Sequence, residues 1–264
     1  MFPIKRILFP VDFSARSRGA CVYVEALAGR FDAEITLLHV IEPPTYNSAL
    51  HEAPPVQPAD FDKFFGADLR YLRVERLIEY GEAAAKIVEI AVERQADLIM
   101  MPTQGLGRFR RFILGSNTAK VLHDAAGAVW TGVHLEDPIS LEAVECRKIT
   151  CAVDLKPSSV VVLEWARQLA GEYQAELTLV HAAPDAASQS KARERLEDLA
   201  AKAKVKASFM VDHGQPSKVV ARLAGCAEAD VLVIGRRIEP GSSGRLEATA
   251  YAIIRQSPCP VVSV

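Results

Sequence analysis

The residue types best suited to chemistry gather in one glycine-rich stretch, MPTQGLGRFRRFILGSNTAKVL, at residues 101–122. It follows an apolar run and leads into a segment with helical spacing. Glycines between a strand and a helix let backbone N–H groups approach a phosphate closely. The stretch contains no G-x-x-x-x-G-K-[ST] phosphate loop. A dinucleotide-binding G-x-G-x-x-G pattern begins at Gly105 and Gly107, but Arg110 stands where the third glycine belongs.

A second polar cluster in this stretch is Gly115-Ser116-Asn117-Thr118, at the expected start of a helix. The first N–H groups of a helix have no acceptors within the helix, and the helix dipole is positive there. The hydroxyl groups of Ser116 and Thr118 add two more donors. Together with Gly105, the cluster favours an anion site, while the alternative for Ser116 is a plain helix N-cap.

A carboxylate follows the first apolar run: Asp12 comes directly after Pro10 and Val11. In open α/β sheets, ligands bind beyond the carboxyl ends of the strands, where the strand order reverses. If the first strand lies beside the fourth in the middle of the sheet, Asp12 faces the glycine-rich stretch across a crevice. It could accept a hydrogen bond from a ribose hydroxyl there, or it could cap the next helix close to Ser14. The two roles can coexist.

Strands that alternate with helices must position these residues. RILFPV, EITLLHV and DLIMM are short apolar runs typical of strands, and SRGACVYVEALAGRF and EAAAKIVEIAVERQ have helical spacing. DFDKFFGADLRYL is read as one more helix. Alternation of this kind predicts βαβ units, and strands that are apolar on both faces predict helices on both sides of a mainly parallel sheet. The fold class is therefore α/β, with doubly wound, flavodoxin-like units of five strands.

This unit occurs twice in the chain. LAGRFDAEITLLH recurs as LAGEYQAELTLVH, and Asp12 and His39 align with Asp154 and His181 at the same offset. Identities at a fixed offset indicate a duplication. The polar, proline-containing segment HLEDPISLEAVECRK separates the copies, so we expect domains at residues 1–140 and 147–264.

The composition excludes several classes of protein. The net charge of the 264-residue chain is only −2, which does not suit nucleic acid or acidic membranes as partners. The N-terminus lacks the pattern of a signal peptide, and no apolar run approaches the ~20 residues of a membrane span.

The histidines show no metal spacing, and those that end the second strand of each copy are expected to be packed or hydrogen-bonded. The cysteines are scattered, which predicts reduced thiols in the cytosol: Cys21, Cys146, Cys151, Cys226 and Cys259.

The run GRFRRF, at residues 107–112, could clamp phosphate or RNA through its arginines and stack bases on its phenylalanines. The simpler interpretation is a helical turn with Phe packed inward and Arg solvated. An intermediate possibility is that an arginine touches the tail of a nucleotide.

In combination, ILFPVDFS, LLHVIEP and the loop pattern resemble the universal stress protein family. Its ATP-binding members carry G-x2-G-x9-G-[ST] after the fourth strand, and the pattern here reads Pro102-x2-Gly105-x9-Gly115-Ser116. The resemblance covers both halves. The first motif glycine is replaced by Pro102, which has no N–H, so any contact that needs this donor is lost.

The resemblance implies that the first half binds ATP, with or without Mg. Asp12 would take the adenosine, the backbone at Val40 would meet the adenine, and the motif glycines with the residues after them would hold ribose and phosphates. The expected site residues are Pro10, Val11, Asp12, Val40, Pro102, Gly105, Arg108, Gly115, Ser116 and Asn117.

The second half departs further from the motif. Gly235 matches the first motif glycine, but Ile238 stands where the first half has Gly105. Glu247 and Ala248 replace the glycine and serine at the helix start. A carboxylate there occupies the place that an anionic phosphate would take. We therefore expect a degenerate second site.

The function implied is that of a stress-response regulatory protein that binds an adenine nucleotide without efficient turnover. A ligand-free adaptor is one alternative. A nucleotide hydrolase or adenylyl-transferring enzyme is another, although the S-G-G-x-D-S and H-x-G-H signatures of such enzymes do not occur. The resemblance also implies that the last strands, AVWTGV and PVVSV, meet across a pseudo-two-fold axis. A further pairing of two chains is left open.

Overall fold

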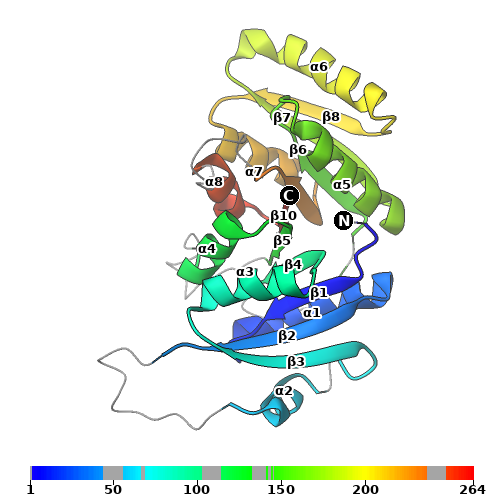
Figure 1. Ribbon diagram of the computed structural model, residues 1–264. Coiled ribbons are helices and arrows are strands. Elements are labelled where there is room, and N and C mark those ends of the chain that lie inside the picture. Colours follow the sequence, from blue (N-terminus) through cyan, green and yellow to red (C-terminus); the bar gives the residue numbers. More distant parts are fainter. Residues whose placement is uncertain are drawn as a thin grey trace.

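The computed structural model describes residues 2–43, 56–66, 69–102, 114–132, 141, 144, 146–236 and 248–264. Strands alternate with helices along the described chain (Figure 1). The first half consists of β1 (Arg6–Pro10), α1 (Ala15–Phe31), β2 (Glu34–Ile41), α2 (Pro58–Phe65), β3 (Arg73–Tyr80), α3 (Ala83–Glu93), β4 (Leu98–Met101), α4 (Ser116–Asp124) and β5 (Ala128–Thr131). The second half consists of β6 (Lys148–Ala152), α5 (Ser159–Tyr173), β7 (Glu176–Ala183), the 3-10 turn η2 (Ala186–Ser188), α6 (Gln189–Lys202), β8 (Ser208–His213), α7 (Pro216–Cys226), β9 (Val231–Ile234), α8 (Ala248–Gln256) and β10 (Val261–Ser263).

The strands form one 10-stranded sheet in the order β3-β2-β1-β4-β5-β10-β9-β6-β7-β8. All neighbours are parallel except β5 and β10, which are antiparallel. Counted within each half, the order is 3-2-1-4-5. The predicted doubly wound class is thus confirmed, and β1 lies beside β4 as expected. Flavodoxin itself has the order 2-1-3-4-5, whereas 3-2-1-4-5 is the order found in Rossmann-type sheets.

Two apolar layers cover the sheet. Successive residues of β1 point to opposite faces, so that Phe9 packs with α1 and α2 while Leu8 packs with α3 and α4. The second half repeats this arrangement, with α5 and α6 on the first face and α7 and α8 on the other. Burial on both faces explains why the central strands are continuous apolar runs.

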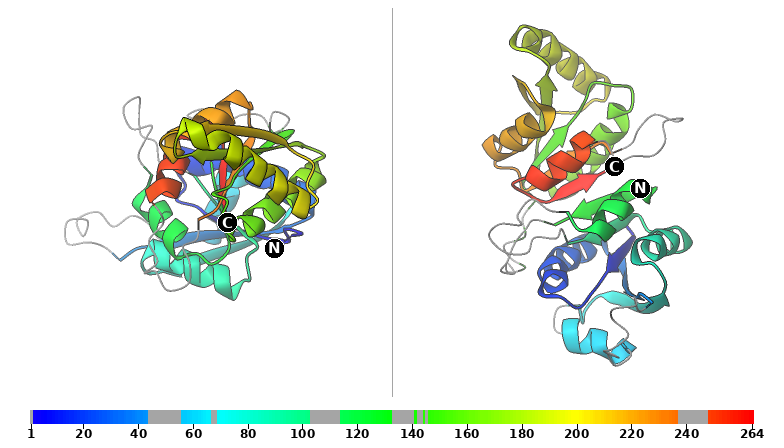
Figure 2. Two further views of the ribbon diagram at one scale, coloured as in Figure 1. Left: turned by 90° about the horizontal axis from the view of Figure 1, so that it is seen from above. Right: turned by 90° about the vertical axis from the view of Figure 1, so that its left-hand side faces the viewer.

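The two halves meet edge to edge through β5 and β10, which lie at the middle of the molecule (Figure 2). Val262 pairs with Trp130 at the centre of this ladder. The Thr131 hydroxyl donates to the Val261 carbonyl at 3.2 Å, and the Ser263 hydroxyl donates to the Val129 carbonyl at 3.3 Å. The expected meeting of the last strands is confirmed.

Aromatic contacts add to this junction on the α1 side. The Phe2 and Trp165 rings are 5.1 Å apart, and those of Phe31 and Tyr173 are 6.1 Å apart. The Arg30 guanidinium lies 5.2 Å from the centre of the Tyr173 ring. Such contacts fix how the halves are oriented as well as holding them together.

The helix predicted over DFDKFFGADLRYL is shorter than expected. α2 ends at Phe65, and its C-cap is Gly66, whose N–H bonds to the Asp62 carbonyl at 2.8 Å. A Cβ on Gly66 would lie 2.2 Å from that carbonyl oxygen. The close approach needs glycine, a poor helix former, and this ends the helix. No helix within the described ranges is long and apolar enough to cross a membrane.

Candidate functional site

The turn after β1 is organised by the Asp12 side chain. Asp12 Oδ1 accepts hydrogen bonds from the Ser14 N–H at 3.0 Å and from the Ser17 hydroxyl at 2.6 Å. Ser17 is buried, and its oxygen also accepts the Asp12 N–H at 3.2 Å. Phe13, which lies between Asp12 and Ser14, has a φ of 56°, in the left-handed region. Both of these hydrogen bonds end on Oδ1, so Oδ2 is the candidate oxygen for a ligand hydroxyl.

These hydrogen bonds also set the charge of Asp12. Burial by itself raises the pKa of the carboxyl, but the bonds from Ser14 and Ser17 outweigh burial and hold the pKa below its ordinary value. Asp12 is therefore an anion at neutral pH. The N-cap of α1 is Ser14, whose hydroxyl accepts the Ser17 N–H at 3.4 Å. Asp12 fixes the turn before the helix and is not the cap itself.

The end of β2 is tied to the same turn. His39 Nδ1 lies 2.8 Å from the Val11 carbonyl oxygen, and the Val11 N–H donates to the Leu38 carbonyl at 2.8 Å. Because a carbonyl only accepts, Nδ1 carries the proton. The Phe13 ring packs against the imidazole with 4.9 Å between ring centres. His39 is thus a packed, hydrogen-bonded residue, as predicted, and the half-buried Val40 follows it directly.

The start of α4 has N–H donors that no side chain of its N-cap residue satisfies. Gly115 is the N-cap, with extended backbone angles and no side chain to cap the helix, and the first turn contains no acidic residue. Ser116 and Asn117 are the first two helical residues, so the N-cap role considered for Ser116 belongs to Gly115. The Thr118 hydroxyl donates to the Pro102 carbonyl at 3.4 Å. This bond attaches the start of α4 to the end of β4.

The neighbouring helix starts are closed by side chains. Besides Ser14 on α1, Glu82 accepts the Ala85 N–H at 2.8 Å and Glu42 accepts the Ala83 N–H at 3.0 Å, both at the start of α3. Lys120 of α4 pairs with Glu82 at 2.8 Å. Within the described part of the chain, the uncapped N–H groups and positive dipole end of α4 are therefore the features at this edge that suit an anion.

The strand register brings these parts together. β1 and β4 pair with Ile7 opposite Leu98 and Leu8 opposite Ile99. Continued along the strands, this register places the Asp12 turn beside Pro102 at the carboxyl edge. Of the predicted residues, those at this edge are Pro10, Val11, Asp12, Val40, Pro102, Gly115, Ser116 and Asn117. Gly105, Arg108 and the other residues of the GRFRRF run lie outside the described residues. No cluster of metal-binding side chains occurs among the residues that the structure describes.

The model of the universal stress protein family matches residues 3–131 and 145–264. The chain belongs to the universal stress protein family. A Staphylococcus aureus (strain USA300) protein that carries the name of a universal stress protein is 32% identical over an alignment of 137 residues that covers 47% of this chain and 81% of that protein. The tandem arrangement predicted from the repeat agrees with the two matched segments.

Solved structures show the same fold over the whole length. A universal stress protein from Archaeoglobus fulgidus superposes with a TM-score of 0.70 at 20% identity, over 98% of this chain and 95% of that chain. A protein of unknown function from Pseudomonas aeruginosa PAO1 superposes with a TM-score of 0.74 at 18% identity, over 99% of this chain and 92% of that one. At these identities the likeness concerns the fold alone.

The second universal stress protein unit repeats the aspartate turn with one change. Asp154 Oδ1 accepts the Lys156 N–H at 3.0 Å and the Ser159 hydroxyl at 2.7 Å, and Leu155 has a φ of 60°. His181 Nδ1 again lies 2.8 Å from a carbonyl, that of Val153. However, Lys156 Nζ lies 3.4 Å from Asp154 Oδ2, so a lysine of the same turn pairs with the oxygen that corresponds to Asp12 Oδ2.

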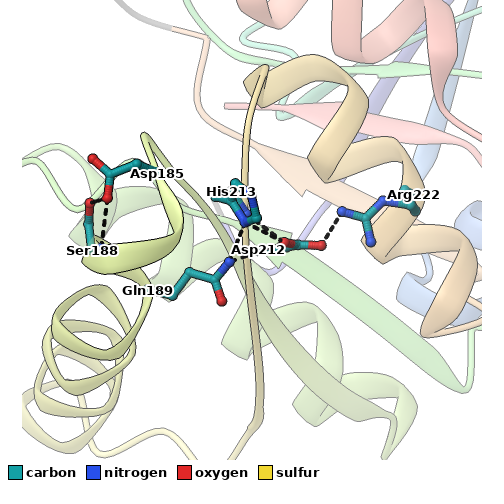
Figure 3. A network of polar contacts seen from close by, with 6 residues as sticks. All are labelled: Asp185, Ser188, Gln189, Asp212, His213 and Arg222. Carbon is teal, nitrogen blue, oxygen red and sulfur yellow. Dashed lines mark hydrogen bonds and ion pairs between the residues drawn. The ribbon is translucent and has the colours of Figure 1, made fainter.

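The far edge of the second unit is closed by a polar network (Figure 3). Arg222 of α7 forms an ion pair with Asp212 of β8, and Gln189 of α6 donates to Asp212 at 3.3 Å. Gln189 also contacts the His213 ring at 2.5 Å. The hydrogen bonds from Arg222 and from the His213 backbone hold the pKa of Asp212 below its usual value. This network joins three elements of one unit and has no part at the junction.

Two of the site-building residues escaped the sequence analysis. Ser17 and Ser159 stand five positions after their aspartates, and this repeated spacing was the signal that could have found them. The bond from Thr118 to Pro102 joins residues 16 positions apart across the loop. No local pattern predicts that bond.

Proposed function

We propose that this universal stress protein is a cytosolic stress-response regulator that binds ATP, with or without Mg, in its first domain and does not turn it over efficiently. The first domain corresponds to residues 1–140. The domain of residues 147–264 carries a degenerate site. The five free cysteines suit the reducing cytosol.

The single observation that carries this proposal is the start of α4 at the switch point of the sheet, which no side chain caps among the described residues. Three N–H groups, those of Ser116, Asn117 and Thr118, have no acceptor within the helix. They lie at the carboxyl edge where the neighbouring strands β1 and β4 lead to helices on opposite faces of the sheet, which is where doubly wound sheets bind ligands. A triphosphate supplies the negative charge that this helix end favours.

In this proposal the other site residues contact the ribose and the adenine. Asp12 Oδ2 is the acceptor for a ribose hydroxyl, because Oδ1 is engaged by Ser14 and Ser17. The backbone at Val40 continues the edge of β2 and can meet the adenine ring. The Pro102 carbonyl is already taken by Thr118, and proline has no N–H, so Pro102 contributes shape and no donor.

Our proposal assigns no catalytic group. His39 uses its Nδ1 proton to hold the Val11 carbonyl. Burial raises the pKa of the Cys151 thiol to about 12, so it is not a thiolate nucleophile at neutral pH. The observations favour retention of the nucleotide over reaction with it.

Gly115→Asp tests the proposal directly. Aspartate is a favourable N-cap residue, so the variant should fold with a melting temperature at or above that of the wild type. Its carboxylate would occupy the helix end that the phosphates need, and ATP affinity should fall by more than tenfold. In the wild type, ATP at about 100 times its Kd should stabilise the fold by about 2.7 kcal/mol, which raises the melting temperature by several degrees.

Gly29→Asp is the matched control. Gly29 is an exposed glycine of α1 with nothing within 4 Å of an added Cβ, so the variant introduces the same charge away from the site. It should bind ATP like the wild type in calorimetric titration. Absence of ATP binding by the wild type would refute the proposal and favour the ligand-free adaptor. Multiple-turnover loss of ATP that Gly115→Asp abolishes would favour an enzyme.

A further inference from the structure

One arginine of the second half reaches into the first. Arg236 follows β9 and Gly235, and it is buried. Its Nη1 donates to the Leu122 carbonyl at 2.6 Å and its Nη2 donates to the Gly127 carbonyl. Its backbone N–H donates to the Val264 carbonyl at 2.9 Å, so that the residue itself is fixed to the end of the chain beyond β10. The side chain thus spans the junction between the two domains.

The backbone before Arg236 is held closely as well. A Cβ added to Gly235 would lie 3.1 Å from Val162 Cγ2 of α5, so the glycine allows β9 to end tight against that helix. The backbone that carries the Arg236 side chain is therefore closely packed. A buried charge is retained when hydrogen bonds compensate its desolvation, and here backbone carbonyls of the other domain supply them.

The target of Arg236 is the carboxyl end of α4. Leu122 is in the last turn of α4, whose C-cap is Ala125. Carbonyls there have no donors within the helix, and a cation stabilises the negative end of the dipole. The basic residue in the last turn of α4 itself is His123, which contacts Asp124 at 2.5 Å. The second domain thus supplies a buried cation to this helix end.

The opposite end of α4 is the proposed phosphate site. α4 has 9 residues, a rigid segment of about 13 Å, so a displacement at Leu122 is carried to Ser116. The first domain holds the helix through Thr118, at 3.4 Å from the Pro102 carbonyl, and through the exposed pair of Lys120 with Glu82. From the second domain, Arg236 adds a buried hydrogen bond to α4.

We propose that Arg236 positions α4 for nucleotide binding, which makes the second domain a built-in regulator of the site in the first. In the repeat, Arg236 stands where the first half has Thr103, at the entrance to the glycine-rich loop. In the second unit, the residue at the start of this loop therefore bonds to helix α4 of the first unit. Coupling is reciprocal, so nucleotide on α4 also strengthens the junction. This inference rests on the proposed function.

The test compares the ATP Kd of full-length variants by calorimetric titration. Arg236→Met keeps the length of the side chain and removes its donors and charge. We expect at least a fivefold rise in Kd, at the lower end of typical coupling factors. Arg236→Lys keeps the charge but not the two-pronged geometry, so its Kd should lie between the two, and it replaces the Met variant if that one does not fold. Amide hydrogen exchange of α4 should accelerate in the same order.

Two controls separate this role from general destabilisation. Arg222→Met makes the same change in the same domain but breaks only the pair with Asp212 (Figure 3). Thr131→Val removes a hydrogen bond of the β5–β10 junction without touching α4. Both should lower the melting temperature and leave the Kd within about twofold of the wild type, because neither moves α4.

Arg236→Met with an unchanged Kd would overturn the inference, as would a Thr131→Val variant that loses as much affinity as Arg236→Met. A wild type that binds no ATP would instead refute the proposed function. In that case the exchange rates of α4 in the ligand-free variants still decide whether Arg236 holds the helix.

Discussion

One oxygen of Asp12 organises its own turn, and in our proposal the other accepts a ligand hydroxyl. The buried Ser17 hydroxyl makes this division possible, since it is 2.6 Å from Oδ1. A carboxyl whose pKa is lower in the folded than in the unfolded state stabilises the fold above its unfolded pKa. That contribution disappears as the pH falls through the folded pKa. Asp12, with a pKa lowered from 3.8, is such a group.

Ser17→Ala should therefore destabilise the protein in a pH-dependent way. At pH 7 the lost hydrogen bond to a partly exposed carboxylate should cost about 1–2 kcal/mol of unfolding free energy. Below the folded pKa, where Asp12 is protonated in both the folded and the unfolded state, the cost should shrink. Urea unfolding at the two pH values measures the difference. An NMR titration of the Asp12 carboxyl carbon should show a higher pKa in the variant.

Ser159→Ala is the matched change in the second domain, where the hydroxyl lies 2.7 Å from Asp154 Oδ1. It should cost a similar free energy while leaving ATP affinity unchanged, whereas Ser17→Ala should weaken ATP binding. An unaltered titration midpoint of Asp12 in Ser17→Ala would show that the hydroxyl does not set its charge.

At the scale of elements, apolar periodicity predicts most of the fold. The central strands are buried on both faces, so their apolar runs are plain, and the duplicated pattern indicates both halves. The end of α2 was predicted wrongly, because it depends on how closely Gly66 approaches the Asp62 carbonyl. The tie from Arg236 to Leu122 could not be foreseen either, since it joins residues 114 positions apart through a single side chain.

The candidate site was predictable to the same extent. Asp12 and the start of α4 stand out by residue type and by their place after strands. Val40 came only from the resemblance to a family. The closed starts of α1 and α3 depend on individual side-chain contacts, such as that of Glu42 with the Ala83 N–H, 41 positions away. Those contacts distinguish α4 from its neighbours, and a sequence pattern does not contain them.

The outermost strand β3 carries charged side chains, unlike β5 and β10 at the junction. On β3, Arg73 bonds to the Asp32 carbonyl at 2.6 Å and Arg76 pairs with Asp62 at 2.5 Å. Charged side chains along an edge strand disfavour pairing with another chain. β5 is fully buried, with Trp130 at 1% exposure, and is covered by β10.

Residues 1–140 expressed alone should therefore form a homodimer. Without β10, Thr131 and Val129 lose their partners, and each unsatisfied buried polar group costs about 1–3 kcal/mol. Antiparallel pairing of β5 with its copy restores these bonds in an isologous interface. Sedimentation at increasing concentration should give the mass of a dimer. A stable, soluble monomer would contradict the prediction.

At the scale of the whole molecule, the chain is a pseudo-symmetric pair whose halves have diverged in charge. The same turn geometry occurs at Asp12 and Asp154, down to the left-handed residue that follows each. Lys156 neutralises Asp154 from within its own turn. The junction is asymmetric too, because Arg236 extends from the second domain to α4 of the first. We infer that duplication left one unit for binding and one for support.

This asymmetry predicts one ATP per chain. In the first domain, as far as the described residues show, no side chain caps the start of α4 and no lysine pairs with Asp12. In the second, Lys156 holds Asp154, and Glu247 stands in the sequence directly before α8, where a phosphate would need to lie. One like-charge contact at partly screened range costs on the order of 1–4 kcal/mol, or about ten- to several-hundred-fold in affinity.

Calorimetric titration should give a stoichiometry of one. Asp12→Ala should abolish the heat of binding, and Asp154→Ala should leave it unchanged, because its carboxylate is already engaged. Two equivalent sites, or a loss of binding with Asp154→Ala alone, would mean that the roles of the domains are reversed or shared.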